Sequence, residues 1–159
     1  MKPRIFIDSS VLFSAIYSSS GHSSDLLLMG AEREVLAVIS DFVIIETRRN
    51  INELKPEKLV HLDQVLATTH FEIATVTSGD VVDAKEWIVL KDAPVLAAAR
   101  VARVDMLVTL DKKHFLDRPE LETYINAPIL TPKEVFQKIK STCQHSKNPV
   151  YPRLSPVNL

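Results

Sequence analysis

Four acidic residues stand where a folded chain could bring their side chains together. Asp8 and Asp111 each follow a short apolar run of the kind that forms a buried strand. Glu46 interrupts an apolar run inside an expected helix, and Asp92 directly precedes a strongly helical segment. Two carboxylates about 4 Å apart repel each other by roughly 4 kcal/mol at an effective dielectric constant of 20. A cluster of four is therefore stable only if protons or a cation offset the repulsion.

Carboxylate oxygens are hard ligands, and they favour Mg²⁺ or Mn²⁺ over softer ions. These ions usually keep several water molecules and bind phosphate oxygens. One ion can activate a water molecule for attack on a phosphodiester, and a second can stabilise the leaving oxygen. The residue types therefore predict a metal-dependent nuclease, with one or two ions.

Each acid also has a simpler interpretation. Asp8 could bind amide groups at the end of a strand, Asp92 could only cap a helix, and Asp111 could be a turn residue. Glu46 could face solvent on an amphipathic helix. Taken alone, Asp92 and Asp111 favour these simpler roles. The prediction of a shared site depends on all four acids having matching positions in the fold.

The elements that must position the acids alternate between strand and helix. Strands are expected at residues 4–8, 35–39, 71–76, 106–109 and 127–132. Helices are expected over residues 9–17, 25–33, 41–54, 56–68, 80–90, 93–103 and 132–140. The expected caps are Ser9 or Ser10 for the first helix, and Ser40 or Asp41 for the third. This alternation predicts a mainly parallel sheet with helices on both faces, and ligands bind such sheets beyond the carboxyl ends of the strands.

The composition is that of an ordinary globular domain. The chain has 159 residues, of which 46% are hydrophobic and 25% charged. We expect one domain over residues 1–140 and an extended tail over residues 141–159, where three prolines occur. The net charge of −1 argues against a protein that coats nucleic acid through its overall field, so any such binding must come from local basic patches and metal.

Cysteine content and hydropathy indicate the compartment. Cys143 is the only cysteine, which excludes an internal disulfide and a thiolate zinc site and fits the cytoplasm. We expect no signal peptide, because the first 20 residues lack a long apolar stretch. No apolar stretch reaches the roughly 18 residues of a membrane span, so no membrane association is expected.

The acids lie in four motifs whose order and spacing carry further information. The motifs are Ile5-Phe-Ile-Asp-Ser-Ser-Val-Leu-Phe-Ser-Ala15, Glu46 after Ser40-Asp41, Lys91-Asp-Ala-Pro-Val-Leu-Ala-Ala-Ala99, and Asp105-Met-Leu-Val-Thr-Leu-Asp-Lys-Lys-His-Phe115. Together they resemble the motifs of the PIN-domain nucleases, over residues 4 to about 140, and the last two are the most specific. One position departs from the family pattern, because Ser10 stands where the family commonly has Asn.

The resemblance implies a three-layer α/β/α sandwich with a Rossmann-like parallel sheet of about five strands. It also implies ribonuclease activity with Mg²⁺ or Mn²⁺, often as the toxin of a VapBC-type toxin–antitoxin pair and often as a homodimer. The metal ligands and catalytic residues would be Asp8, Glu46, Asp92 and Asp111. The hydroxyl groups that orient them would belong to Ser9, Ser10 and Thr109. The implied partners are an RNA substrate, an antitoxin and a second copy of the chain.

Basic residues close to the acids in sequence are candidates for binding the RNA backbone. They are Arg49, Lys91, Lys112 and Lys113, and the two lysines that directly follow Asp111 are preferred. Ordinary solvated helix faces are the alternative for each of them. The five histidines have no spacing typical of metal ligands, so solvated or structural roles are expected for them.

Other functions fit the sequence less well. A phosphatase with Asp8 as nucleophile would need an acid at position 10, where Ser10 stands. A dinucleotide-binding enzyme would need the Gly-x-Gly-x-x-Gly motif, and a serine hydrolase the Gly-x-Ser-x-Gly motif, and neither occurs. Two alternatives stay open: a PIN-like domain that binds RNA or protein without cutting, and an RNA-processing nuclease outside any toxin–antitoxin system.

Overall fold

A computed structural model describes residues 1–145 of the chain. Its sheet has the strand order β3-β2-β1-β4-β5, and every neighbouring pair is parallel. The strands are β1 (Arg4–Ile7), β2 (Leu36–Ser40), β3 (Glu72–Ala74), β4 (Met106–Val108) and β5 (Ile129–Leu130). This five-stranded parallel sheet with flanking helices confirms the expected α/β/α class.

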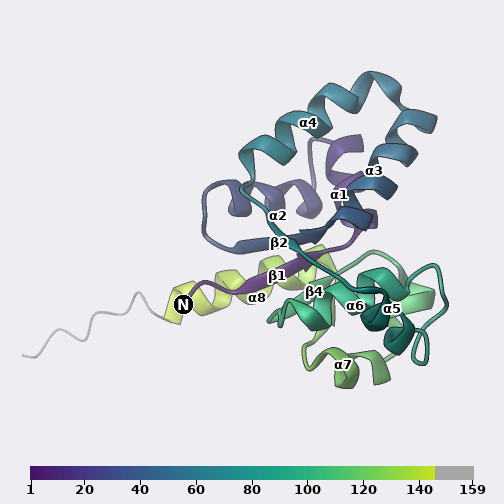
Figure 1. The fold of residues 1–159 in the computed structure, drawn as a ribbon. Coiled ribbons are helices and arrows are strands. Elements are labelled where there is room, and N and C mark those ends of the chain that lie inside the picture. Colours follow the sequence, from purple (N-terminus) through teal and green to yellow (C-terminus); the bar gives the residue numbers. More distant parts are fainter. Residues whose placement is uncertain (146–159) are drawn as a thin grey trace, which may run out of the picture.

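The helices fall into two layers (Figure 1). They are α1 (Ser9–Tyr17), α2 (His22–Ala31), α3 (Asp41–Leu54), α4 (Leu59–Thr68), α5 (Ser78–Ala84), α6 (Ala93–Val101), α7 (Glu120–Ile125) and α8 (Pro132–His145), with short helical turns η1 (Pro56–Lys58) and η2 (Lys112–Leu116). Helices α1 to α4 lie on one side of the sheet, and α8 packs against α2. Helices α5 and α6 pack together on the other side, with α7 against α6.

The core is centred on β1, the middle strand of the sheet. Ile5, Phe6 and Ile7 have no exposed surface, as expected of a strand that helices cover on both faces. Ile5 pairs with Ala37 of β2 on one side and with Met106 of β4 on the other. Asp8 therefore leaves the sheet between the ends of two neighbouring strands.

Helix α6 lies close to the sheet because its inner face is built of small residues. Ala97, Ala98 and Ala99 are all buried, while Val95 and Leu96 fill the core around them. Such close, rigid packing fixes the residue at the start of the helix.

Several boundaries differ from the sequence-based expectation. Helix α5 ends at Ala84 instead of residue 90, because the chain then forms turns that bury Ile88. The short helices η2 and α7 lie in a segment for which no element was predicted. Helix α8 continues to His145, and the hydroxyl groups of Ser141 and Thr142 bond to carbonyl groups one turn back, as serine and threonine do inside helices. The rest of the expected tail, residues 146–159, lies outside the described residues.

Within residues 1–145, none of the helices has the length and apolar character that crossing a bilayer requires.

Candidate metal centre

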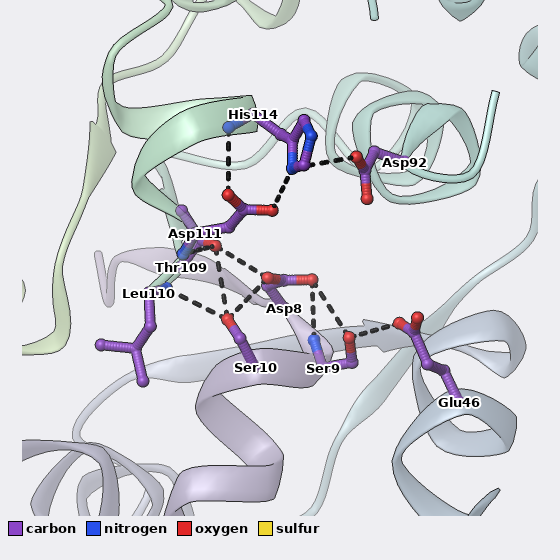
Figure 2. A network of polar contacts seen from close by, with 9 residues as sticks. All are labelled: Asp8, Ser9, Ser10, Glu46, Asp92, Thr109, Leu110, Asp111 and His114. Atoms are coloured by element: carbon purple, nitrogen blue, oxygen red, sulfur yellow. Dashed lines mark hydrogen bonds and ion pairs between the residues drawn. The ribbon is translucent and has the colours of Figure 1, made fainter. Parts of the chain in front are cut away.

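The four acids lie around one rim of the sheet, beyond the carboxyl ends of the strands. Figure 2 shows a network of polar contacts that contains all of them. It runs from Glu46 through Ser9 to Asp8, and from there through Thr109 and the adjoining loop to Asp111, His114 and Asp92 (Figure 2). The fold therefore brings together acids that are more than a hundred residues apart in sequence.

Asp8 is buried, and one of its two carboxylate oxygens accepts hydrogen bonds in both of its acceptor directions. Its Oδ2 accepts hydrogen bonds from Ser10 Oγ and Thr109 Oγ1, both at 2.7 Å. Its Oδ1 accepts the Ser9 amide at 2.8 Å, so Asp8 caps α1, and the expectation that Ser9 or Ser10 would do so is wrong. A carboxylate oxygen has two acceptor directions. The two directions of Oδ2 are used. Oδ1 also lies 3.4 Å from Ser9 Oγ, but this contact is long, and the same hydroxyl group makes a much shorter one with Glu46.

The two hydroxyl groups that bind Asp8 are themselves oriented by backbone amides. Ser10 Oγ accepts the Leu110 amide at 3.0 Å, and Thr109 Oγ1 accepts the Asp111 amide at 3.0 Å. Each hydroxyl has only one hydrogen to donate, and in both residues it points to Asp8. The loop after β4 is thus tied to the start of α1, and Ser10 serves this purpose at the position where Asn is common in the family.

Burial raises the pKa of Asp8 above its usual range. The hydrogen bonds from Ser10, Thr109 and the Ser9 amide oppose this rise, while the nearby charge of Glu46 adds to it. Ionised Asp8 is therefore unfavourable in the protein alone, because its charge lacks water and has an acidic neighbour. A cation at this rim would remove that penalty.

Glu46 reaches the network from α3, whose first turn is capped by Ser40 as expected. Its side chain is half-buried, and Ser9 Oγ donates a hydrogen bond to Glu46 Oε2. The Ser9 hydroxyl hydrogen is thereby committed to Glu46, while the Ser9 amide binds Asp8. Ser9 thus connects the two acids and holds Glu46 toward the site instead of toward solvent.

Asp92 occupies the cap position of α6 without acting as a cap. Its side chain makes no capping hydrogen bond, and Oδ2 is buried with no hydrogen-bond partner among the described residues. Buried polar atoms are normally satisfied, and an orphaned carboxylate oxygen is costly. The simple capping role therefore does not account for Asp92.

The pKa of Asp92 is raised chiefly by burial. Lys91 and His114 counteract the rise, whereas the charges of Asp111 and Asp8 increase it. The charges of Asp8 and Asp111 therefore act directly on the pKa of Asp92, as expected for acids of one cluster.

Asp111 caps η2 and is held by His114 twice. Its Oδ1 accepts the His114 amide at 3.0 Å, and its Oδ2 lies 2.9 Å from the ring nitrogen Nδ1. Partial burial favours the neutral acid, but the contacts with His114 and the charge of Lys91 outweigh it, so the pKa of Asp111 is lowered. Asp111 therefore stays ionised more readily than Asp8 and Asp92, whose pKa values are raised.

His114 is the site residue that the sequence analysis missed. Its Nδ1 lies 3.7 Å from Asp92 Oδ2, too far for a hydrogen bond but within ion-pair range. Ligand atoms of Asp92, Asp111 and His114 all lie within 4.8 Å of one another. The available signal was local: a histidine three residues after an acid that starts a helical turn faces the same side as that acid.

The four predicted basic residues are all exposed. Lys112 and Lys113 begin η2 directly after Asp111, and Lys91 is close enough to lower the pKa values of Asp92 and Asp111. Arg49 lies in α3 about one turn after Glu46. Two other arginines form ion pairs instead. Arg48 pairs with Asp63 of α4 at 2.6 Å, and Arg100 pairs with Asp83 of α5 at 3.1 Å.

The donor set fits a divalent cation. Two ligands of one Mg²⁺, each about 2.0–2.1 Å from the ion, lie at most about 4.2 Å apart. The ligand atoms of Asp92, Asp111 and His114 therefore need only small adjustments to share one ion. Asp92 Oδ2, which has no hydrogen-bond partner among the described residues, would be an oxygen ligand of such an ion.

Comparisons with known proteins identify relatives of this fold. Solved structures with a similar fold include the toxin VapC20 from Mycobacterium tuberculosis, described as cleaving the sarcin–ricin loop (18% identity, TM-score 0.55, covering 69% of this chain and 91% of that one). A second is VapBC2 from Rickettsia felis bound to a promoter DNA fragment (16% identity, TM-score 0.60, covering 80% of this chain and 98% of that one). A third is a toxin–antitoxin complex from Klebsiella pneumoniae (21% identity, TM-score 0.56, covering 80% of this chain and 97% of that one). No curated protein sequence matches the chain.

At these identities the solved structures show a shared fold. The sequence model described as "PIN domain" goes further, because it matches residues 4–113, which include all four acids and Thr109. This match spans more than half of the chain. The chain therefore belongs to the PIN-domain family.

Proposed function

We propose that this protein is a metal-dependent ribonuclease that hydrolyses phosphodiester bonds with Mg²⁺ or Mn²⁺. The observation that carries the proposal is the buried Oδ2 of Asp92, which has no hydrogen-bond partner among the described residues, beside Asp111 at a rim that also holds Asp8 and Glu46. Structural stability alone does not explain such an arrangement, since an unpartnered buried acid destabilises a fold. Membership of the PIN-domain family supports the same function.

Each acid has its own part in the proposed site. Asp92 and Asp111 hold the ion most directly. Asp8, which raises the pKa of Asp92 through its charge, adds a carboxylate from the end of β1. Glu46, held by Ser9, is placed to orient a water molecule or take part in binding a second ion. Ser9, Ser10 and Thr109 keep the acids in place through their hydroxyl groups. A divalent ion bound there supplies Lewis-acid activation of water and neutralises charge on the phosphate.

The exposed basic residues fit an RNA backbone. Lys112 and Lys113 stand beside Asp111, while Lys91 stands beside Asp92. Phosphates that approach the acids therefore meet positive charge on the same rim, and Arg49 on α3 extends it past Glu46. These four residues are the proposed contacts to the substrate backbone.

We further propose that the chain is the toxin of a toxin–antitoxin pair in the cytoplasm and that it acts as a homodimer. Two of the similar solved structures contain toxin–antitoxin complexes, and VapC20 is described as a toxin. Expression of the chain alone should then arrest growth, and co-expression of its antitoxin should restore growth. Expression of an RNA-processing nuclease would not arrest growth, so there would be no arrest for an antitoxin to relieve.

The direct test is cleavage of a labelled RNA with Mn²⁺ or Mg²⁺, with EDTA as the control. Wild-type protein should cut, and EDTA should abolish cutting. Asp92→Asn keeps the shape of the side chain but loses its charge, so it should reduce the rate at least about 100-fold, which corresponds to about 2.7 kcal/mol. Equal, weak cleavage by wild type and Asp92→Asn would reject the catalytic proposal and favour a binding module.

A further inference from the structure

The ring of His114 faces the two acids that hold the proposed ion most directly. Its Nδ1 lies 2.9 Å from Asp111 Oδ2 and 3.7 Å from Asp92 Oδ2 (Figure 2). The backbone amide of His114 also binds Asp111 Oδ1 at 3.0 Å. This second bond fixes the start of η2, so the ring is presented to the carboxylates from a well-defined piece of backbone.

The contact with Asp92 is too long for a hydrogen bond and leaves Asp92 Oδ2 without one. If His114 served only to pair the acids, its ring would be expected to satisfy the buried oxygen of Asp92. Instead, one nitrogen and two carboxylates point to a common space, with ligand atoms within 4.8 Å of one another. In the structure, Nδ1 donates its hydrogen to Asp111 Oδ2, because an ionised carboxylate only accepts. The same three groups become ligands of one ion once the ring proton sits on Nε2 and the ion takes the place of this hydrogen.

We propose that His114 is a ligand of the metal through Nδ1, and that the centre therefore prefers Mn²⁺ to Mg²⁺. This inference rests on the proposed nuclease function, which it extends to the choice of ion. Mg²⁺ binds oxygen ligands almost exclusively, whereas imidazole nitrogen suits transition metals. A site with one nitrogen and carboxylate oxygens thus favours Mn²⁺ over Mg²⁺ more than an all-oxygen site does.

Ligation through Nδ1 requires that its lone pair faces the ion, so the ring proton must then sit on Nε2. His114 is only partly buried, so the ring has room for the small adjustment that ligation needs. Asp111 Oδ2, which contacts Nδ1 in the structure, becomes available to the same ion.

Electron spin echo measurements on protein loaded with Mn²⁺ alone test the assignment. A directly bound imidazole nitrogen adds a nitrogen modulation to the echo of Mn²⁺, and carboxylate and water ligands contain no nitrogen that could produce it. We expect this nitrogen coupling in the wild type and its loss in His114→Asn, which puts an amide group close to the position of Nδ1. His70→Asn is the matched control, because His70 is exposed and precedes the amino end of β3, whereas the site lies beyond the carboxyl ends of the strands.

Calorimetric titration gives a second readout that is independent of RNA cleavage. Loss of even an outer partner of a ligand costs about 10- to 100-fold in metal affinity. We therefore expect His114→Asn to weaken Mn²⁺ binding at least about tenfold and Mg²⁺ binding less, so the preference for Mn²⁺ falls. His114→Gln places its amide group close to the position of Nε2 instead of Nδ1, so it should weaken Mn²⁺ binding in the same way. This variant replaces His114→Asn if that protein does not fold.

Absence of nitrogen coupling in the wild type, or an unchanged preference for Mn²⁺ in the His114 variants, would overturn the inference. If Mn²⁺ still binds, is lost in Asp92→Asn and supports RNA cleavage, the proposed function stands and only the role of His114 fails. If the wild type binds neither ion, both proposals fail.

Discussion

Thr109, just after β4, donates its hydroxyl hydrogen to Oδ2 of Asp8, just after β1, over 2.7 Å. Thr109 has no exposed surface, and the same hydroxyl accepts the Asp111 amide at 3.0 Å. One small side chain therefore sets both the direction of the Asp8 carboxylate and the course of the loop that carries Asp111. The precision of the proposed metal centre depends on this contact.

Replacing Thr109 with valine tests that dependence, because valine has the same shape and lacks the hydroxyl. We expect Thr109→Val to lower the free energy of unfolding by about 1–3 kcal/mol, since the Asp111 amide loses its partner. At about 2–4 °C per kcal/mol, the melting temperature should fall measurably in calorimetry. RNA cleavage should fall by about 10- to 100-fold.

The control for that variant is Thr68→Val, on the exposed end of α4. Surface changes of this type usually stay within about 0.5 kcal/mol. Equal melting temperatures and cleavage rates for Thr109→Val and the wild type would show that Asp8 does not need Thr109.

The acids also predict how the stability of the metal-free protein depends on pH. Asp8 and Asp92 have raised pKa values, so the unfolded chain loses their protons at lower pH than the folded protein does. Their contribution is full below the ordinary aspartate range near 3.9 and is lost as the pH rises through the raised values. The lowered pKa of Asp111 acts in the opposite sense, so its contribution is lost as the pH falls through that value.

Asp92→Asn removes one of these opposing contributions. Without metal, we expect this variant to melt about 2–4 °C above the wild type at pH 7, because a neutral amide carries no desolvated charge, and to show little gain near pH 4. Glu53→Gln, a charge removal on the exposed part of α3, should show no such pH-dependent gain. A lower melting temperature for Asp92→Asn at pH 7 would mean that the Asp92 charge is stabilised within the protein itself.

A divalent ion should reverse the order of the two melting temperatures, so that the wild type melts above Asp92→Asn. An ion at about 100 times its dissociation constant stabilises the folded state by about 2.7 kcal/mol. Wild-type protein should therefore gain melting temperature with Mn²⁺ and lose the gain with EDTA, while Asp92→Asn should respond weakly. If both proteins respond equally, the ion binds elsewhere.

The lysines beside Asp111 predict a salt effect. The double variant Lys112→Ala and Lys113→Ala should bind single-stranded RNA more weakly, with a slope of log affinity against log salt that is smaller by about 0.7 per lysine. Lys2→Ala is the control, because Lys2 precedes the amino end of β1, whereas the site lies beyond the carboxyl ends of the strands. Filter binding at several salt concentrations measures both slopes, and an unchanged slope in the double variant would remove these lysines from the RNA contact.

The fold was largely predictable because its signals are local and repeated. Apolar runs of strand length alternate with helical segments, which predicted the parallel sheet that the structure confirms. The resemblance that the motifs around Asp8, Asp92 and Asp111 suggested was likewise confirmed, since the PIN-domain model matches residues 4–113. Less predictable were the end of α5 and the short helices η2 and α7, where tertiary packing decides the conformation.

The contacts within the site were harder to foresee. Ser9 and Ser10 lie next to each other, yet Ser9 binds Glu46 and Ser10 binds Asp8, and only the three-dimensional arrangement separates these roles. His114 had no metal-ligand spacing relative to another histidine, because its partners are carboxylates, one of which lies on a different helix. Sequence distance carries no information about the approach of His114 to Asp92.

An anomalous difference map from a crystal soaked in Mn²⁺ tests the central claim most directly. The proposed metal centre predicts a peak between Asp92 and Asp111, with Asp92 Oδ2 bound to the ion. No peak at that rim, with Asp92 Oδ2 paired instead to another protein group, would contradict it.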